Sequence, residues 1–455
     1  MLREIKKNKL FFGLVVIGLF LSFTFNVFGT MPSATFTSNF KDSETLVANQ
    51  VICNNSLFNA QLIVSKDPTK SSSHVTNCTT TELEPYSSQF GLQGKTFTIG
   101  FQAIHKVVTS AEPEYFIVFA QLLTALASAL LFALIALWVK VRFGLAPAIV
   151  VGSLIALSPM LVGFGRNLYW MLPLMIAPLV FVLYYFQPKQ TFKKYVLFWI
   201  ILGALFYIRY LCGYEYLTSL TLMAFAPVVY FLYLQKSRVK EYVKYAVAVV
   251  AVSVVAFAAA LFTHIAALTI YTGSIDQSIE RVSQRVEERT VEGNKYTMYP
   301  YGNLKVIAPS FYEVTNAYID YDARIASGSI VAASLVSLAT YLLIPVVHLP
   351  LEFNASFGLY LQSTAMFIIV LAALFITRKR WVAKPMLRTV NGLYLGALVG
   401  IVAYCSWLVL AFSHSLVHAH INGILLYLPF ALFGYTILGL FVQSIYRKIK
   451  QKSKK

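Results

Sequence analysis

The chain has 455 residues, of which 58% are hydrophobic and 12% are charged, with a formal net charge of +18. An ordinary soluble domain carries about 25% charged residues, so this composition excludes soluble globular, fibrous and disordered proteins. Uncharged runs of about 20 residues recur along the sequence and predict an all-α integral membrane protein, a multi-span bundle of about 10–11 helices.

The expected membrane segments begin with residues 10–30, which follow a basic N-terminus. This run is longer than the apolar part of a signal peptide, so we expect an uncleaved anchor. The remaining runs are 115–139, 143–163, 168–186, 195–208, 216–234, 245–271, 325–349, 357–377, 390–412 and 422–443. Two long hydrophilic stretches, 31–114 and 272–324, interrupt them.

Most of the 37 lysines and arginines lie in the N-terminus, the short loops and the C-terminal tail. Basic residues stay cytoplasmic, so both termini are predicted to be cytoplasmic in a bacterial inner membrane. An even number of crossings follows, and residues 325–349, with Pro345 and Pro350, are expected to be the segment that does not cross. Without a basic patch interleaved with aromatic residues, the charge does not indicate nucleic-acid binding.

The predicted organisation therefore has five parts. Residues 1–30 form a cytoplasmic tail and first span, 31–114 a first extracytoplasmic loop, and 115–271 a six-span bundle. Residues 272–356 form a second loop with an interfacial helix and a re-entrant segment, and 357–455 the last three spans and a basic tail.

The first loop contains Cys53 and Cys78. An extracytoplasmic location favours a disulfide between them, and closing a loop of this length stabilises by about 3 kcal/mol. Two free thiols are the alternative.

The second loop contains Arg281, Arg285 and Arg289 at intervals of four, beside apolar residues at helical spacing. This pattern predicts an amphipathic helix at the outer membrane surface. The arginines either form ion pairs along a solvated helix or grip a phosphate.

Several ionisable residues are expected to lie toward the outer face of the membrane. Arg209 lies fifteen residues after Lys194, a rise of about 22 Å, so Arg209 and Glu215 are predicted at the bottom of a cavity. A structural Arg–Glu pair is the alternative. The further candidates are Arg166, His264, His414 and His418. The two late histidines favour hydrogen bonding or proton relay over a metal site.

Asp42-Ser43-Glu44 follows the first span by about a dozen residues. One span, a loop opening with this D-x-E pair, six spans and a second loop with an interfacial helix resemble the GT-C superfamily of membrane glycosyltransferases. The resemblance covers roughly residues 10–324. It implies transfer of a sugar from a polyprenyl-phosphate or polyprenyl-diphosphate donor to a lipid, glycan or protein acceptor on the outer face.

The resemblance implies Asp42 as the base that takes the acceptor proton, and Glu44 as its assistant or as a ligand of Mg²⁺ or Mn²⁺. Arg166, Arg209, Arg285 or Arg289 would stabilise the departing phosphate. Gln89 would hydrogen-bond a sugar, with a plain loop turn as the alternative; Glu215, His264 and the late histidines would support the site.

Three other classes of protein remain open: a cell-envelope polysaccharide polymerase or ligase, a transporter or lipid flippase, and a non-catalytic scaffold. The sequence leaves the oligomeric state open.

Overall fold

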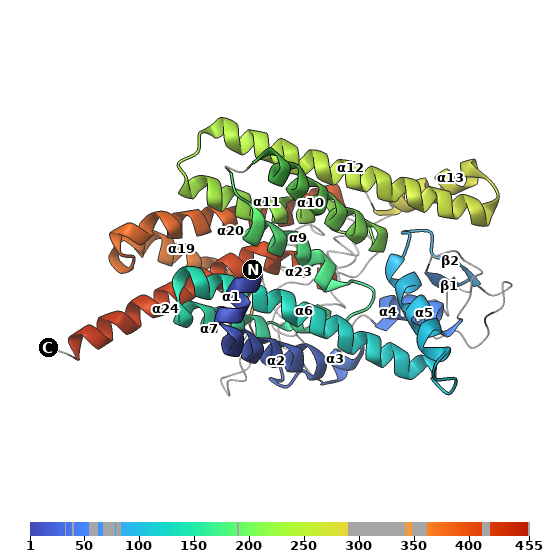
Figure 1. Ribbon diagram of the computed structural model, residues 1–455, viewed down its shortest axis with the longest axis horizontal. Helices are drawn as coiled ribbons and strands as arrows, with labels where there is room; N and C mark the ends of the chain where they lie inside the picture. Colours follow the sequence, from blue (N-terminus) through green and yellow to red (C-terminus); the bar gives the residue numbers. More distant parts are fainter. Residues whose placement is uncertain are drawn as a thin grey trace, which may run out of the picture.

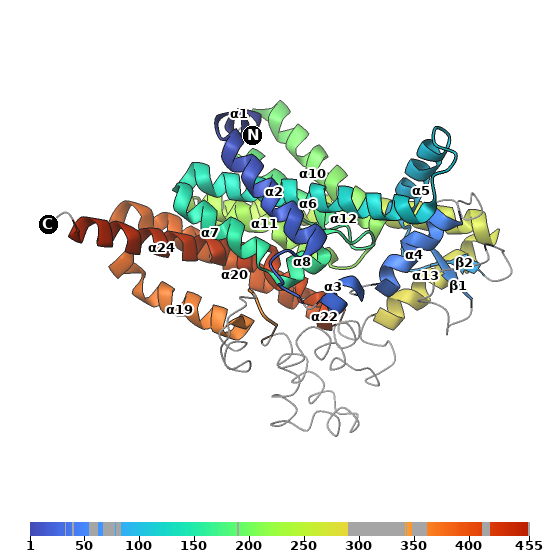
Figure 2. The same cartoon turned by 90° about the horizontal axis from the view of Figure 1, so that it is seen from below.

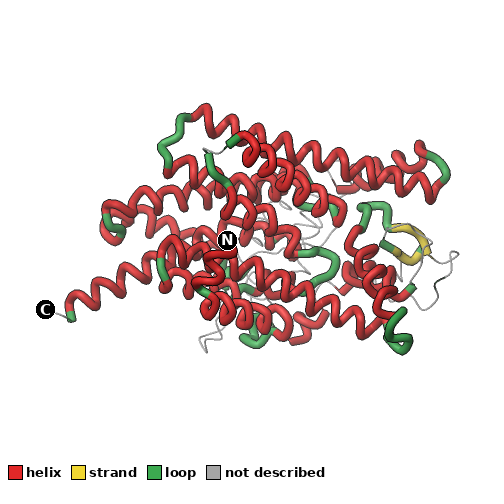
Figure 3. Tube along the Cα trace, in the orientation of Figure 1, coloured by secondary structure: helices red, strands yellow, loops and turns green. Residues whose placement is uncertain are grey.

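The computed structural model describes residues 1–31, 33–38, 41–53, 62–66, 78, 83–188, 191–289, 342, 344–347, 362–411 and 419–453. In these ranges the regular secondary structure is helical apart from one two-stranded sheet, and loops connect the elements (Figure 3). Long helices lie side by side along the longest axis of the molecule (Figure 1). The predicted helical membrane protein is confirmed in this respect.

Six helical stretches in the described residues are long and apolar enough to cross a membrane: α6 (Pro113–Phe143), α10 (Phe192–Cys212), α11 (Leu217–Leu234), α12 (Val239–Thr272), Lys384–Leu410, and Ile424–Lys452. Lys384–Leu410 comprises η3 (Lys384–Met386) and α20 (Leu387–Leu410), and Ile424–Lys452 comprises α23 (Ile424–Leu426), η4 (Tyr427–Ala431) and α24 (Leu432–Lys452). Shorter apolar helices are α2 (Lys9–Phe25), which follows α1 (Leu2–Lys7), and α9 (Leu172–Tyr185).

The span predicted over residues 143–163 is broken in two. The helices α7 (Leu145–Ala156) and α8 (Pro159–Gly165) meet at an angle of 68° and count as a seventh span only if taken together. Ser158 caps α8, since its hydroxyl accepts from the Leu161 N–H, and Pro159 occupies the first turn. A capping serine followed by proline is a helix start, which explains the break. Gly165 brings α8 against Phe23 of α2, because a Cβ there would lie 2.6 Å from the Phe23 Cβ.

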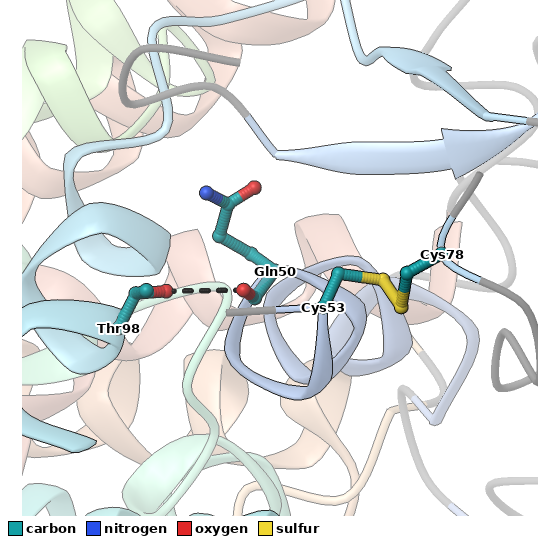
Figure 4. The surroundings of a disulfide bond; sticks show 4 residues. All are labelled: Gln50, Cys53, Cys78 and Thr98. Carbon is teal, nitrogen blue, oxygen red and sulfur yellow. Dashed lines mark hydrogen bonds between the residues drawn. A yellow bond between two sulfur atoms is a disulfide. The ribbon is translucent and has the colours of Figure 1, made fainter. Parts of the chain in front are cut away.

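The first hydrophilic stretch is folded against the bundle. It contains α3 (Ser33–Ser38), α4 (Lys41–Ile52) and α5 (Leu92–His105), and an antiparallel pair of strands that the sequence did not predict, β1 (Ile63–Ser65) and β2 (Leu83–Pro85). Cys53 and Cys78 form a disulfide with their Cα atoms 5.3 Å apart. Beside it the Thr98 hydroxyl donates to the Gln50 carbonyl oxygen and joins α5 to α4 (Figure 4).

The amphipathic helix predicted in the second hydrophilic stretch is α13 (Ile275–Arg289). Gly273, with φ of +70°, ends α12 and turns the chain into α13. Ile275, Ile279 and Val286 are exposed, as expected of a helix that rests its apolar face on a membrane surface. Both views place α13 with α4, α5 and the two strands at one end of the molecule, called the loop end below (Figures 1 and 2).

The opposite end carries the basic termini of α6, α24 and α19 (Thr364–Trp381), and is called the basic end. The short helix α22 (Ala419–Asn422) precedes α23. Residues 344–347 form bends around an isolated bridge between Pro345 and Ser363, where the Val346 N–H donates to the Gln362 carbonyl and the Tyr435 hydroxyl donates to the Val346 carbonyl. This end of the predicted segment 325–349 is therefore not helical, since Pro345 lacks the N–H that a helix needs. Most of that segment lies outside the described residues.

Candidate functional site

The site is organised by the turn of residues 166–171, which joins α8 to α9 at a place where the sequence predicted helix from residue 168 onward. Asn167 is buried, and its side-chain oxygen accepts from the backbone N–H groups of Tyr169 and Trp170, both at 2.9 Å. Met171 then adopts φ of +49° before α9 begins. An asparagine that bonds its own following backbone competes with a helix. The turn therefore leaves Tyr169 and the backbone on either side of it outside any helix.

Glu44 of α4 binds one side of this turn. Its carboxylate accepts from the Leu168 N–H at 2.9 Å and from the Gln121 side-chain amide of α6 at 2.9 Å. Burial raises the pKa of the Glu44 carboxyl, an effect that the Leu168 and Gln121 hydrogen bonds and the Arg166 guanidinium partly offset. Glu44 thus anchors the D-x-E motif to the bundle.

Tyr169 reaches the other side of the turn. Its hydroxyl lies 3.3 Å from the Gln89 side-chain oxygen and 3.5 Å from a Glu215 carboxylate oxygen, and donates toward both. The Gln93 amide donates to the carbonyls of Tyr169 and Cys212, at 3.1 and 3.0 Å. The start of α5, the α8–α9 turn and the end of α10 are joined by these bonds.

Arg209 and Glu215 lie where α10 ends and α11 begins, and they are 1% and 2% exposed. The guanidinium donates to the carbonyls of Gly213 and Glu215 at 3.1 and 3.5 Å. A Cβ on Gly213 would lie 2.4 Å from the Glu215 carboxylate and 2.6 Å from the Gln89 amide oxygen. A side chain at this position would displace the Glu215 carboxylate and the Gln89 amide from where they now lie.

His264 of α12 lies next to Tyr214 of the same α10–α11 turn. It is fully buried, with its ring 5.7 Å from that of Tyr214. Both of its ring nitrogens, and the Nε of Arg209, have no hydrogen-bond partner among the described protein atoms. Buried polar groups are almost always hydrogen-bonded, so such atoms mark a place where a polar ligand or water would bind. We call Gln89, Gln93, Tyr169, Arg209, Glu215 and His264 the polar cluster.

The arginines predicted to bind phosphate are placed differently from one another. Arg166 lies over the Phe36 ring and donates to the carbonyls of Thr24 and Phe36, at 3.5 and 3.3 Å. Arg285 of α13 is half-exposed and donates to the Ser87 hydroxyl at 3.4 Å, two residues before Gln89. Arg209 is committed to backbone carbonyls. Arg166 and Arg285 are both half-exposed, and of these two Arg285 contacts Ser87, which is close in sequence to Gln89 of the polar cluster.

Some predicted site residues fall outside what the structure describes. His414 and His418 lie outside the described residues altogether. Asp42 and Arg289 belong to α4 and α13, but their side chains are not among those described.

The predicted divalent cation stays a prediction, because the Asp42 side chain is not among those described. The two carboxylate oxygens of Glu44 each accept an N–H hydrogen bond, and Arg166 lies nearby, so this carboxylate is a poor metal ligand. Within the described residues, no three His, Cys, Asp or Glu side chains gather as a metal site would need.

Nothing in the sequence predicted the roles of Gln121, Tyr169 or Tyr214 in this site. The available signal was Asn167, a polar side chain that interrupts two apolar runs. Gln121 is one polar residue within a long apolar helix and becomes meaningful only when α4 packs on α6.

Glu44 yields a testable dependence of stability on pH. Because its folded-state pKa is raised, the unfolded chain releases the proton first as pH rises, and the folded state loses stability above the ordinary carboxyl pKa. We expect the thermal midpoint of the detergent-solubilised protein to fall between pH 5 and pH 8 by a margin that Glu44→Gln reduces. Glu114→Gln, an exposed site on α6, is the matched control. Equal pH dependence in the wild type and Glu44→Gln would contradict the prediction.

Comparison with protein-family models, curated proteins and solved structures finds no match to this chain. The fold therefore defines the class, a multi-span helical integral membrane protein, and the resemblance to GT-C enzymes depends on the sequence features alone.

Proposed function

We propose that the protein is a membrane glycosyltransferase that moves a sugar from a polyprenyl-phosphate or polyprenyl-diphosphate donor to an acceptor hydroxyl on the extracytoplasmic face. The observation that carries the proposal is the attachment of Glu44, through the Leu168 N–H, to the same turn that supplies Tyr169 to the polar cluster. Glu44 of the acidic motif is thereby linked, through this turn, to the buried Glu215.

The position of the cluster supports an enzyme over a transporter. Arg209 and Glu215 lie at the end of α10 and the start of α11, and His264 lies eight residues before the end of α12. Ion-coupled transporters place such groups near the membrane midplane, in broken helices. Groups at the loop end suit chemistry that occurs at the membrane surface.

In the proposed reaction the acceptor oxygen forms a bond to the anomeric carbon as the bond from that carbon to the phosphate oxygen breaks. Asp42, assigned by the resemblance, takes the acceptor proton, and the polyprenyl phosphate leaves with the electron pair. Arg285 stabilises the negative charge on the departing phosphate. His264 and Gln89 hydrogen-bond sugar hydroxyls, while Glu44 and Arg209 position the loop and the turn around them.

The test is transfer by the purified protein in lipid vesicles from a panel of radiolabelled polyprenyl-phosphate sugars. The proposal expects at least one donor to be consumed with release of polyprenyl phosphate. If every donor moves across the membrane intact, or none is consumed, the proposal is wrong.

Two arginines of α13 give a matched pair for the phosphate role. Arg285→Gln is expected to lower transfer by about 10²-fold, since it removes one positive charge from the leaving phosphate. Arg281→Gln, one turn earlier and placed over the Tyr271 ring, removes the same charge and is expected to change the rate less than threefold. Equal losses of transfer rate in both variants would indicate that α13 acts only as a general membrane anchor and that Arg285 has no particular role at the phosphate.

A further inference from the structure

The basic end contains a cavity of about 520 Å³ between the ends of α6, α19 and α24. This volume is within the range of small-molecule sites. Its walls carry four cationic side chains from three helices, namely Arg142, Arg380, Arg447 and Lys448. It lies at the opposite end of the bundle from the polar cluster and takes no part in the proposed reaction.

The three helix ends that form the cavity are tied together by hydrogen bonds. The Gln443 amide donates to the Phe143 carbonyl at 3.1 Å, and the Lys448 ammonium donates to the Arg380 carbonyl at 3.0 Å. Arg142 is held over the rings of Trp138 and Phe231, at 5.5 and 5.1 Å. Stacking on a ring fixes a guanidinium while it leaves N–H groups available to a ligand.

These positive charges have no counter-charge within the cavity. None of the lining residues is acidic, and no aspartate or glutamate follows Glu352 in the sequence. Like charges that converge without a partner repel one another, and an anion would relieve the repulsion. Arginine forks match phosphate oxygens in particular.

The surroundings of the cavity indicate a phosphate carried by a lipid. Along the same turns of α24, Ile445, Tyr446 and Ile449 are 42%, 60% and 62% exposed. Exposed apolar side chains beside a basic pocket fit a headgroup with its acyl chains alongside, whereas a free phosphate would make no use of them. We propose that this cavity binds the phosphate-bearing headgroup of an anionic membrane lipid.

The test is equilibrium binding of fluorescent phosphatidylglycerol to the purified full-length protein in neutral maltoside micelles, with fluorescent phosphatidylcholine as the neutral probe. The double variant Arg380→Gln/Arg447→Gln is expected to lose affinity for phosphatidylglycerol on the order of tenfold or more. The control Lys379→Gln/Lys450→Gln removes the same number of charges from the same two helices, at exposed positions outside the cavity. It should change affinity less than threefold.

Equal losses in the two double variants would overturn the proposal, because they would show attraction to diffuse positive charge. Inorganic phosphate that displaces the lipid at equal concentration would also overturn it, in favour of a free-anion site. If the cavity variant is not monodisperse, Arg447→Gln alone, compared with Lys450→Gln, carries the same comparison.

Discussion

Replacement of Asp42 by asparagine is expected to lower the rate of sugar transfer by about 10²–10⁴-fold, the usual contribution of a positioned general base. Asparagine keeps the size of the side chain and removes its ability to accept the acceptor proton. The folded protein should be retained, since Glu44, which is unchanged in this variant, keeps the hydrogen bonds that anchor α4 to the bundle. The measurement is initial-rate transfer by purified protein, with size-exclusion chromatography as the check on folding.

The matched control is Asp276→Asn, which changes an exposed acid in the first turn of α13 at the same end of the molecule. This variant should transfer sugar within about twofold of the wild type, because it lies outside the proposed site and surface substitutions are usually tolerated. Full activity in Asp42→Asn would remove the D-x-E motif from the mechanism and leave the resemblance without its functional residue.

The largest effect on stability is expected from Arg209→Met. Methionine fills a similar volume but leaves the buried carbonyls of Gly213 and Glu215 without their donor. Each buried acceptor left without a donor costs about 1–3 kcal/mol. The measurement is the free energy of unfolding in mixed micelles, from a denaturant series followed by tryptophan fluorescence.

Arg281→Met provides the comparison, because its guanidinium is half-exposed and lies 5.9 Å from the Tyr271 ring centroid. This substitution should lower the free energy of unfolding by less than about 1 kcal/mol, because an exposed cation–π contact contributes no more than that. If Arg209→Met lowered the free energy of unfolding as little as Arg281→Met, the α10–α11 turn would be held by other contacts and Arg209 would not be a positioning residue.

The long helices were predictable because hydrophobic length alone determines them. The interruptions were harder to predict. Ser158-Pro159 is a readable helix start, yet it lies inside an uninterrupted apolar run, and Asn167 lies between two such runs. Each break leaves backbone N–H groups without a helical partner, and their burial in an apolar environment is unfavourable. In the folded protein the side chains of Ser158 and Asn167 accept hydrogen bonds from these groups. The strands β1 and β2 are three residues each, too short for alternation to reveal them.

The site was predictable to the extent that charge within apolar sequence is informative. Helix rise placed Arg209 and Glu215 below the surface, and both are buried. Their side-chain neighbours could not be inferred, because Gln89 and Tyr169 come from separate segments that meet the α10–α11 turn only in the folded protein. The Arg209 guanidinium, which was expected to line a cavity, donates to the backbone carbonyls of its own turn.

The most direct measurement is a cryo-electron microscopy structure of the protein in nanodiscs with a non-hydrolysable polyprenyl phosphonate sugar. The account predicts density for the sugar within hydrogen-bonding distance of His264 and Gln89, and for the phosphonate beside Arg285 of α13. Density for the headgroup only at the basic end, or at the loop end but away from the polar cluster, would contradict it.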